Sequence, residues 1–317
     1  MLKEKFISSD RQIAEFITAL KGRQEIPLKF EYLNKGAERW DKLVRSKMYG
    51  LGKIEIDLIR NNMSKIIASF SGKEMNLMDL GCGNGMKAVP FILELLKIYQ
   101  IVNYLALDIS QEMIDLALVN IKKIIHGKVN LQGVVVDFEA GNFADVTRQT
   151  KKSGHPHNLL LLLGHTLGNP PDKNRLLMNI RESMTMTDFL LIGVEYLDPS
   201  KIQETVSHYK NRLIYKTQFT GLEEIGIEMT DGDFEVRYNS RKNQIETYFV
   251  FRKKRTIIFH EEEIIFRKGD KILLMLSYKF TDRIIKNLLD DTSFKVVKTF
   301  LNEQGNYVLV LCKPKHL

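Results

Sequence analysis

The feature that most constrains the fold of this chain is a regular alternation of short apolar strands and helical segments between residues 75 and 195. The predicted strands are Asn76–Leu80, Asn103–Leu107, Leu131–Val136, His157–Leu163 and Asp188–Glu195. Helical patterns over Val89–Tyr99 and Gln111–Ile125 separate the first three. Strands that alternate with helices at this spacing predict βαβ units around a parallel sheet. We therefore expect an α/β fold with a Rossmann-like core.

This rhythm breaks after Glu195 and returns near the C-terminus. A helix is predicted at Pro199–Leu213, and the extended segments that follow it suggest a small antiparallel region: Phe234–Tyr238, Ile245–Phe251, Ile257–Phe259 and Ile264–Phe266. The chain then returns to a helix and two strands, the last of them Tyr307–Cys312. We expect a core domain at residues 71–198 and 272–317. A second α+β domain, which would bind the substrate, is expected at residues 1–70 and 199–271.

Composition excludes several classes of protein. The 317 residues are 44% hydrophobic and 27% charged, which suits a folded globular chain. No apolar run reaches the roughly 18 residues of a membrane helix, and Met1–Phe6 does not begin a secretory signal. Two cysteines, Cys82 and Cys312, suggest a reducing cytoplasm rather than a disulfide framework. The absence of CxxC and HExxH patterns argues against a metal site.

The net charge of +8 comes from short, scattered basic clusters. Such an excess attracts anions, including nucleic acid. A solvated, lysine-rich surface explains the scattered clusters better, so we expect a small-molecule substrate, with no membrane partner and nucleic acid as the weaker alternative.

The strongest local motif is the glycine loop Met78–Gly85, which follows the first predicted strand. Gly81 and Gly83 allow the backbone to turn sharply and to approach a ligand closely. Met86 stands where a dinucleotide fingerprint has its third glycine. Asp79, just before the loop, would repel a pyrophosphate but suits the cationic methionine end of S-adenosylmethionine. The motif therefore predicts S-adenosylmethionine as the cofactor.

Two further acids follow the next two strands. Asp108 ends the second strand, where a carboxylate can accept hydrogen bonds from both ribose hydroxyls. Asp137 and Phe138 follow the third strand, where the acid can accept from the adenine amino group while the ring covers the base. Any one of these acids can be a helix N-cap. Three of them at the ends of successive strands favour a nucleotide site. An antiparallel last strand is also the usual ending of class I methyltransferases.

Several segments resemble the histidine-specific methyltransferase family, which includes the L-histidine Nα-methyltransferase of ergothioneine biosynthesis. The segment Gly164–Asn169 resembles the family's G-x-T-[IL]-G-N pattern, and Phe30–Gly36 resembles its aromatic-x-x-x-G entry. Further matches lie at Tyr49 and in the segments Gly193–Leu197, Asn243–Glu246 and Ser277–Phe280. The matches run in a common order from about residue 30 to the C-terminus.

The resemblance implies roles for five residues of this chain. Asn169 and Tyr209 would bind the carboxylate of the substrate. Tyr32 and Tyr49 would line the pocket for the amine and act in catalysis. Ser277 would contact the substrate side chain. The reaction that the resemblance implies is methyl transfer from S-adenosylmethionine to an amine, held close to the methyl group and in line with it.

The chain departs from the family at the position that reads the imidazole. The family has an acidic residue two positions before the serine, where this chain has Met275, and a methionine after its Ile-Glu pair, where this chain has Thr247. A methionine packs but offers no useful acceptor. We therefore expect an amino acid or related amine with an apolar or aromatic side chain, and not histidine. Met275 as a core residue of a divergent strand is the alternative.

Two other functions compete with this interpretation. Asn169-Pro170-Pro171-Asp172 resembles the [DNS]-P-P-[YFW] motif of nucleic-acid amino-methyltransferases, but the fourth residue is not aromatic. A non-catalytic protein that retains S-adenosylmethionine binding is the second alternative. His165 is either a proton acceptor or, as is more common, a hydrogen-bonded loop residue.

Overall fold

The computed structural model describes residues 7, 9–46, 50–70 and 74–315. The chain forms two compact units. The first unit comprises Met1–Arg45 and Asp198–Tyr278, and the second unit comprises Ser46–Leu197 and Lys279–Leu317. Each unit therefore combines two distant parts of the sequence.

Two elements lie in a different unit from the one that the sequence suggested. Helix α3 (Leu51–Ala68) was expected with the N-terminal residues but belongs to the second unit, because its apolar stripe packs in the same hydrophobic core as the central strands. Strand β10 (Lys271–Tyr278) was expected in the core domain but belongs to the first unit, because it pairs antiparallel with β7 (Gln244–Phe251).

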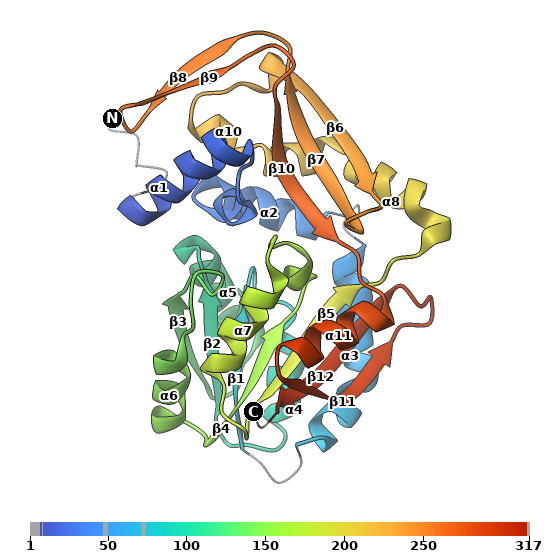
Figure 1. Ribbon diagram of the computed structural model, residues 1–317. Helices are drawn as coiled ribbons and strands as arrows, with labels where there is room; N and C mark the ends of the chain where they lie inside the picture. Colours follow the sequence, from blue (N-terminus) through green and yellow to red (C-terminus); the bar gives the residue numbers. More distant parts are fainter. Residues whose placement is uncertain (1–6, 8, 47–49, 71–73, 316–317) are drawn as a thin grey trace. The chain divides into compact units, whose positions relative to one another are not determined.

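The second unit is built around a seven-stranded sheet (Figure 1). Its strands are β1 (Met75–Leu80), β2 (Val102–Asp108), β3 (Val129–Val135), β4 (His157–Leu162), β5 (Phe189–Glu195), β11 (Phe294–Leu301) and β12 (Tyr307–Pro314). Their order is β11-β12-β5-β4-β1-β2-β3. The first five run parallel to their neighbours among themselves, whereas β12 is antiparallel to β5 and to β11. This order confirms the predicted Rossmann-like core with an antiparallel last strand.

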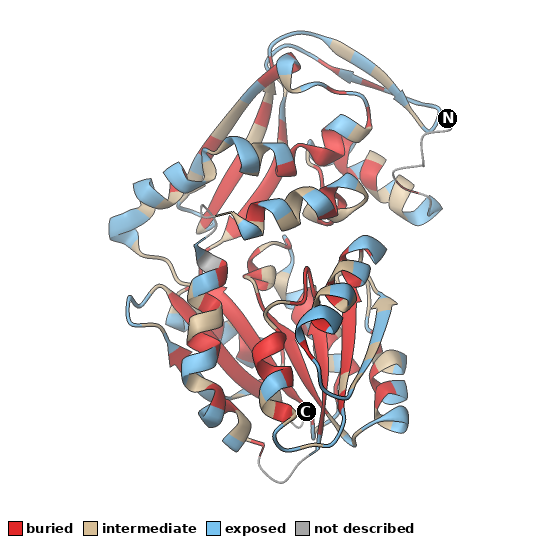
Figure 2. Ribbon diagram, turned by 180° about the vertical axis from the view of Figure 1, so that it is seen from behind, coloured by how far each residue is buried: buried red, intermediate tan, exposed pale blue. Residues whose placement is uncertain are grey.

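Helices cover both faces of this sheet. On one face, α3, α4 (Val89–Leu95) and α5 (Gln111–Ile124) share a core with the strands. On the other lie α6 (Ala144–Ser153), α7 (Lys173–Ser183) and α11 (Asp282–Asp291), with α7 in contact with both α6 and α11 (Figure 1). The central strands are accordingly buried along nearly their whole length (Figure 2). Burial on both faces explains the continuous apolar run of β4, which alternation would not produce.

The first unit contains a three-stranded antiparallel sheet in the order β10-β7-β6, with β6 at Gly232–Asn239. A separate hairpin is formed by β8 (Arg255–Phe259) and β9 (Glu262–Phe266). The helices of the first unit are α1 (Asp10–Thr18), α2 (Lys35–Arg45), α8 (Ile202–Tyr209), α9 (Arg212–Gln218) and α10 (Thr220–Glu224). The same unit contains the short helical turns η1 (Ala19–Arg23), η2 (Leu28–Tyr32), η4 (Pro199–Lys201) and η5 (Met229–Asp231). The single helix predicted at Pro199–Leu213 ends early because Asn211 caps a new helix by accepting from the Leu213 amide.

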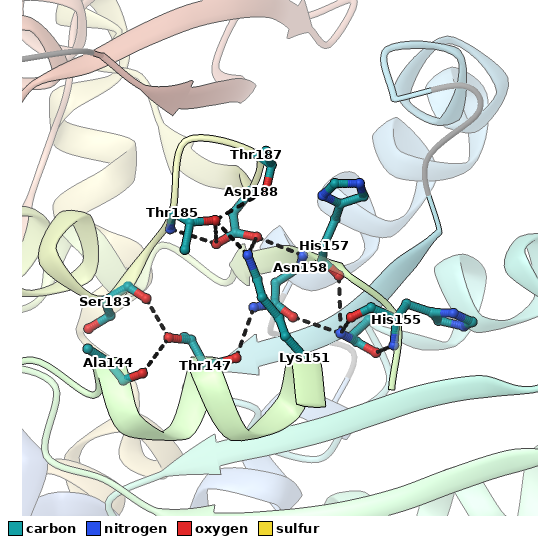
Figure 3. A network of polar contacts seen from close by, with 11 residues as sticks. Ala144, Thr147, Lys151, His155, His157, Asn158, Ser183, Thr185, Thr187 and Asp188 are labelled. Carbon is teal, nitrogen blue, oxygen red and sulfur yellow. Dashed lines mark hydrogen bonds and ion pairs between the residues drawn. The ribbon is translucent and has the colours of Figure 1, made fainter. Parts of the chain in front are cut away.

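The amino ends of the parallel strands carry a polar network. Asn76 on β1 donates to Asn158 on β4 at 2.9 Å and accepts from Asn103 on β2 at 3.2 Å, and Asn130 on β3 donates to Asn103 at 2.8 Å. One asparagine from each of four adjacent strands thus forms a ladder. Asp188, which lies just before β5, extends the network: its carboxylate accepts from the backbone N–H of Asn158 and pairs with the Lys151 ammonium (Figure 3). At this edge of the sheet, the polar side chains therefore satisfy one another's hydrogen bonds.

Candidate active site

The glycine loop connects β1 to the turns before α4. Gly81, Gly83 and Gly85 have φ values of 68°, 52° and 74°, the left-handed region that glycine adopts without strain. The amide of Gly81 donates to the Leu107 carbonyl of β2 at 2.8 Å, which ties the loop to the neighbouring strand. A β-carbon on Gly85 would lie 3.1 Å from Ala117 of α5, so this glycine lets the loop pack on that helix. The glycines therefore let the loop turn sharply and pack closely on the neighbouring strand and helix.

Asp79 is a buried carboxyl at the end of β1, with 3% of its surface exposed. The Tyr104 hydroxyl donates to it at 2.9 Å. Burial raises the pKa of Asp79 to about 7, while the Tyr104 bond and the charge of Lys87 act in the opposite direction. Burial makes the ionised form of this carboxyl unfavourable because it removes the water around the charge. A bound ammonium group would offset that loss and favour the ionised form. The role that the sequence predicts for Asp79, binding the cationic end of S-adenosylmethionine, stays a prediction, and this environment is chemically compatible with it.

Asp108 lies beside the glycine loop, at the end of β2. Its carboxylate accepts from the amides of Ser110 at 3.1 Å and Gly83 at 3.4 Å. Burial raises the pKa of Asp108 to about 6, and these amide hydrogen bonds lower it. The structure thus brings Asp108 and Gly83 together. Burial also raises the pKa of the neighbouring Cys82 thiol, so this cysteine is neutral rather than a nucleophile.

Asp137 and Phe138 follow β3. Asp137 accepts from the amides of Glu139 and Ala140 at 3.2 and 3.1 Å, so it stabilises the turn after the strand. The ring of Phe138 lies 3.8 Å from the β-carbon position of Gly81, so the aromatic residue borders the glycine loop. The six predicted cofactor residues therefore lie at or just beyond the carboxyl ends of β1, β2 and β3.

The loop after β4 carries His165 and Asn169. His165 has a φ of 63°, and its Nδ1 accepts from the Glu195 amide of β5 at 3.0 Å. Because Nδ1 is used as an acceptor in this bond, His165 anchors the loop. Asn169 is half-buried just after the helical turn η3 (Thr166–Gly168). Asp172 caps α7 through the Arg175 amide at 2.9 Å, which gives the acid after the two prolines a structural purpose.

Two charged residues near the carboxyl ends of the parallel strands were not predicted from the sequence. Lys87 lies beyond the glycine loop and forms an ion pair of 2.8 Å with Glu55 of α3. Glu55 is fully buried and also accepts from the Gly164 amide. One signal was present in the sequence: Glu55 falls on the apolar stripe of its helix, three and four residues before Leu58 and Ile59. Lys87 had no comparable signal.

Three of the predicted substrate residues meet in the first unit. The Tyr209 hydroxyl, at the end of α8, donates to Ser277 Oγ on β10 at 2.9 Å. Met275, two residues before Ser277, is buried in an apolar cluster with Val206, Val236 and Ile245, against which Tyr209 also packs. A hydroxyl pair thus lies beside an apolar surface.

Thr247 lies on the same face of the sheet, since it pairs in register with both Met275 and Val236. Its side chain is fully buried, and its Oγ1 has no hydrogen-bond partner. The sheet face therefore presents hydroxyl groups and apolar groups, and no carboxylate at the position of Met275.

Tyr32 lies on the turn η2, and its ring packs edge-on against Trp40 of α2, with 6.4 Å between the ring centroids. Its neighbour Glu31 is buried, and burial raises the pKa of Glu31 to about 8. Tyr49 lies outside the described residues. Tyr32, Tyr209, Met275 and Ser277 thus belong to the first unit, and Asn169 to the second.

The seven-stranded sheet, its glycine loop and the buried acid before that loop define a class I methyltransferase core. A model of the family described as histidine-specific, S-adenosylmethionine-dependent methyltransferases matches residues 12–314. The chain belongs to this family and is a methyltransferase that uses S-adenosylmethionine.

Individual relatives are more distant. The N-methyltransferase imqF of Aspergillus flavus is 24% identical over 310 residues, an alignment that covers 92% of this chain and 82% of that protein. Ergothioneine biosynthesis protein 1 of Schizosaccharomyces pombe is 20% identical, and the match covers 90% of this chain but 38% of that longer protein. An S-adenosylmethionine-dependent methyltransferase structure from Clostridium acetobutylicum is 12% identical, with a TM-score of 0.47, over 89% of this chain and 99% of that one.

No helix among the described residues is long and apolar enough to cross a membrane. No group of three or more histidine, cysteine, aspartate or glutamate residues within the described ranges is arranged to hold a metal ion.

Proposed function

We propose that this methyltransferase acts on the amine nitrogen of an amino acid or a related small molecule, and that its substrate carries an apolar or aromatic side chain rather than an imidazole. The observation that carries the proposal is the surface beside the Tyr209–Ser277 hydroxyl pair. Met275 lies there, buried among apolar residues, where the resemblance places an acidic residue. The related protein of Aspergillus flavus is named an N-methyltransferase, which supports nitrogen as the acceptor.

The cofactor residues divide by charge and position. S-adenosylmethionine supplies an electrophilic methyl group on a sulfonium centre. Asp79 would hold the ammonium of its methionine end, because this buried carboxyl has one hydroxyl donor, Tyr104, and gains from a cation. Asp108 would accept from the ribose hydroxyls, Asp137 would accept from the adenine amino group, and Phe138 would cover the base. Gly81 and Gly83 would allow the nucleoside close approach.

The substrate residues would hold the amine in place. Asn169 and Tyr209 would donate to a carboxylate, and Ser277, which accepts from Tyr209 in the structure, would contact the side chain. Tyr32 and Tyr49 would orient the amine. Holding the nitrogen close and aligned is the main requirement of an in-line transfer, since fixed orientation removes much of the entropic part of the barrier.

The proposal is tested by methyl transfer from radiolabelled S-adenosylmethionine to a panel of the twenty amino acids and the amines that correspond to them. Aromatic or large apolar members should be methylated and histidine should not. Transfer to histidine at a comparable rate would sink the side-chain part of the proposal. Failure of every amine in the panel, with S-adenosylhomocysteine bound normally, would favour a larger amine or a nucleic acid.

A substitution sharpens this test. Met275→Glu restores the acid that the resemblance places there, and we expect it to raise kcat/KM for histidine at least about tenfold, because a buried carboxylate is a strong acceptor for an imidazole N–H. Met275→Gln is the matched control, with the same length and no charge. Equal gains in both variants would show that size, not charge, excludes histidine.

We also propose that the protein is cytoplasmic. Both cysteines, Cys82 and Cys312, are buried and free, as expected of a chain that folds where thiols stay reduced. Fractionation of cells that express the tagged chain tests this placement.

A further inference from the structure

Lys279 is a buried lysine just after β10 that has no part in the proposed binding of cofactor or substrate. Its side chain is 1% exposed, and its ammonium pairs with the carboxylate of Glu195 at the end of β5. A buried ammonium is costly unless a charged partner and hydrogen bonds replace the water that it has lost. Lys279 therefore cannot leave Glu195 without a loss of stability, so the ion pair holds both residues in place.

The backbone beside this ion pair is also hydrogen-bonded. The Phe280 amide donates to the Glu195 carbonyl at 3.1 Å, and the Leu197 amide donates to the Phe280 carbonyl at 2.7 Å. Residues 195–197 and 279–280, the paired segments, thus lie side by side around an isolated parallel bridge. The ion pair and the two backbone bonds together fix the position of the Glu195 backbone.

His165 attaches the loop after β4 to both paired segments. Its Nδ1 accepts from the Glu195 amide at 3.0 Å, and its ring lies edge-on to that of Phe280, with 6.0 Å between the ring centroids. His165 is 5% exposed, so water does not readily replace the bond to Nδ1 if that bond breaks. The position of the imidazole therefore depends on the position of the Glu195 amide.

The rest of the loop is folded on His165. The Gly168 amide donates to the His165 carbonyl at 2.8 Å, and the Asn169 amide donates to the Thr166 carbonyl at 3.1 Å. A β-carbon on Gly168 would lie 2.2 Å from His165 Nε2, so the imidazole lies directly against the backbone of the residue before Asn169. Displacement of the imidazole would therefore displace the backbone that carries Asn169.

We propose that Lys279, Glu195 and His165 are positioning residues for Asn169: the buried ion pair fixes the Glu195 backbone, the Glu195 amide fixes the imidazole, and the imidazole fixes the loop that presents the Asn169 side chain. The carboxylate-binding role of Asn169 rests on the proposed function. In that role, the three residues act through Asn169 on the affinity for a substrate that carries a carboxylate.

Four variants separate these steps. His165→Phe keeps an aromatic ring beside Phe280 and removes the acceptor. His165→Asn keeps an acceptor at the δ position and tolerates the left-handed φ of 63°, so it is the conservative variant. Lys279→Met removes the ammonium and keeps an apolar stem. Lys151→Met is its matched control, because Lys151 also pairs with a buried acid, Asp188, but at the amino edge of the sheet.

The first measurement needs no substrate. It is hydrogen–deuterium exchange of a peptide that contains Gly168 and Asn169, read by mass spectrometry, because exchange of a hydrogen-bonded amide reports its local opening. We expect exchange at least about tenfold faster in His165→Phe and Lys279→Met, and within about threefold of the unaltered protein in His165→Asn and Lys151→Met. Amides of the buried strand β1 serve as the reference for a change in global stability.

Unchanged exchange of this peptide in His165→Phe would overturn the proposal, and so would equal acceleration in His165→Phe and His165→Asn. Acceleration in Lys279→Met that matches that of the β1 amides would show a general loss of stability and would remove Lys279 from the proposal. If Lys279→Met fails to fold, Glu195→Gln takes its place, since it removes the charge and keeps the shape of the side chain.

The second measurement compares a methylated amino acid with the amine that lacks its carboxylate. His165→Phe and Lys279→Met should raise KM at least about fivefold for the amino acid and less than about twofold for the amine, with kcat little changed, because the effect passes through the carboxylate. Equal losses for both compounds would overturn the link to the carboxylate. If no amine is methylated, the proposed function fails, and the exchange measurement alone decides whether the three residues position Asn169.

Discussion

Asp188 and Asp79, two buried acids at opposite ends of the strands of the seven-stranded sheet, have contrasting surroundings. At the amino edge, Asp188 accepts from two backbone amides, the Thr185 hydroxyl and the Lys151 ammonium (Figure 3). At the carboxyl edge, Asp79 is almost as deeply buried, yet within the described part of the chain it accepts from one hydroxyl group, that of Tyr104. Burial raises the pKa of Asp79 to about 7.

The difference separates an acid that stabilises the fold from one that, under the proposed function, binds the cofactor. A buried acid with four donors stabilises the fold, because each donor offsets part of the lost hydration. A buried acid with one donor destabilises the free protein and gains when a cation binds. Ligands of open α/β sheets bind outside the carboxyl ends of the strands, so the incompletely bonded acid lies at the edge where a ligand is expected.

The largest effect that the comparison predicts is at Asp188. Asp188→Asn leaves the Lys151 ammonium without its charged partner, and we expect the free energy of unfolding to fall by about 3–5 kcal/mol, the usual cost of breaking a buried ion pair from one side. Urea unfolding at pH 7 measures it. A loss below about 1 kcal/mol would mean that the amino edge does not hold the sheet together as its contacts indicate.

The candidate site was predictable from the sequence where its signals are local. The glycine loop and Asp79 lie within a few residues of each other, and Asp108 and Asp137 follow because parallel strands place their carboxyl ends at one edge. The fold class follows from the same rhythm of strands and helices.

The parts that depend on contacts between distant segments were not predictable. Glu55 accepts a hydrogen bond from the backbone N–H of Gly164, which lies 109 positions further along the chain. The sequence near either residue gives no sign of this contact. The apolar pattern of β10 is compatible with a strand in either unit. Its antiparallel pairing with β7, which assigns it to the first unit, cannot be predicted from that pattern. Each asparagine of the ladder looks like an ordinary polar residue until four strands are aligned.

A change of intermediate size in the free energy of unfolding is expected at Asp79. Its sign is opposite to that at Asp188, because substitution of Asp79 should stabilise the free protein. Because the pKa of the folded-state carboxyl is raised from 3.8 to about 7, the folded protein binds more protons than the unfolded chain between these values. The free protein therefore loses stability as pH rises from about 4 to about 7. Asp79→Asn cannot ionise, so its stability relative to the unaltered protein should improve by on the order of 3 kcal/mol between pH 5 and pH 7, at about 1.4 kcal/mol for each pH unit.

Thermal unfolding of both proteins at pH 5 and pH 8, without ligand, measures this difference. The same variant should bind S-adenosylhomocysteine more weakly, so that stability and binding move in opposite directions. A stability difference that does not change with pH would show that Asp79 is ionised without penalty, and the contrast between the two edges would then fail at its central residue.

The smallest effect concerns the end of the asparagine ladder. Asn130 is exposed and donates one hydrogen bond to Asn103, whereas Asn76 is fully buried and bonds to Asn103, Asn158 and the backbone of His155. Water can replace the bond lost at an exposed position but not at a buried one. We expect Asn130→Ala to cost less than about 1 kcal/mol and Asn76→Ala about 2–3 kcal/mol, in urea unfolding, with cofactor affinity unchanged in both. Equal losses would mean that the ladder acts as a unit, in which the outermost bond orders all four strands, and the amino edge would then be a cooperative clamp rather than a set of independent contacts.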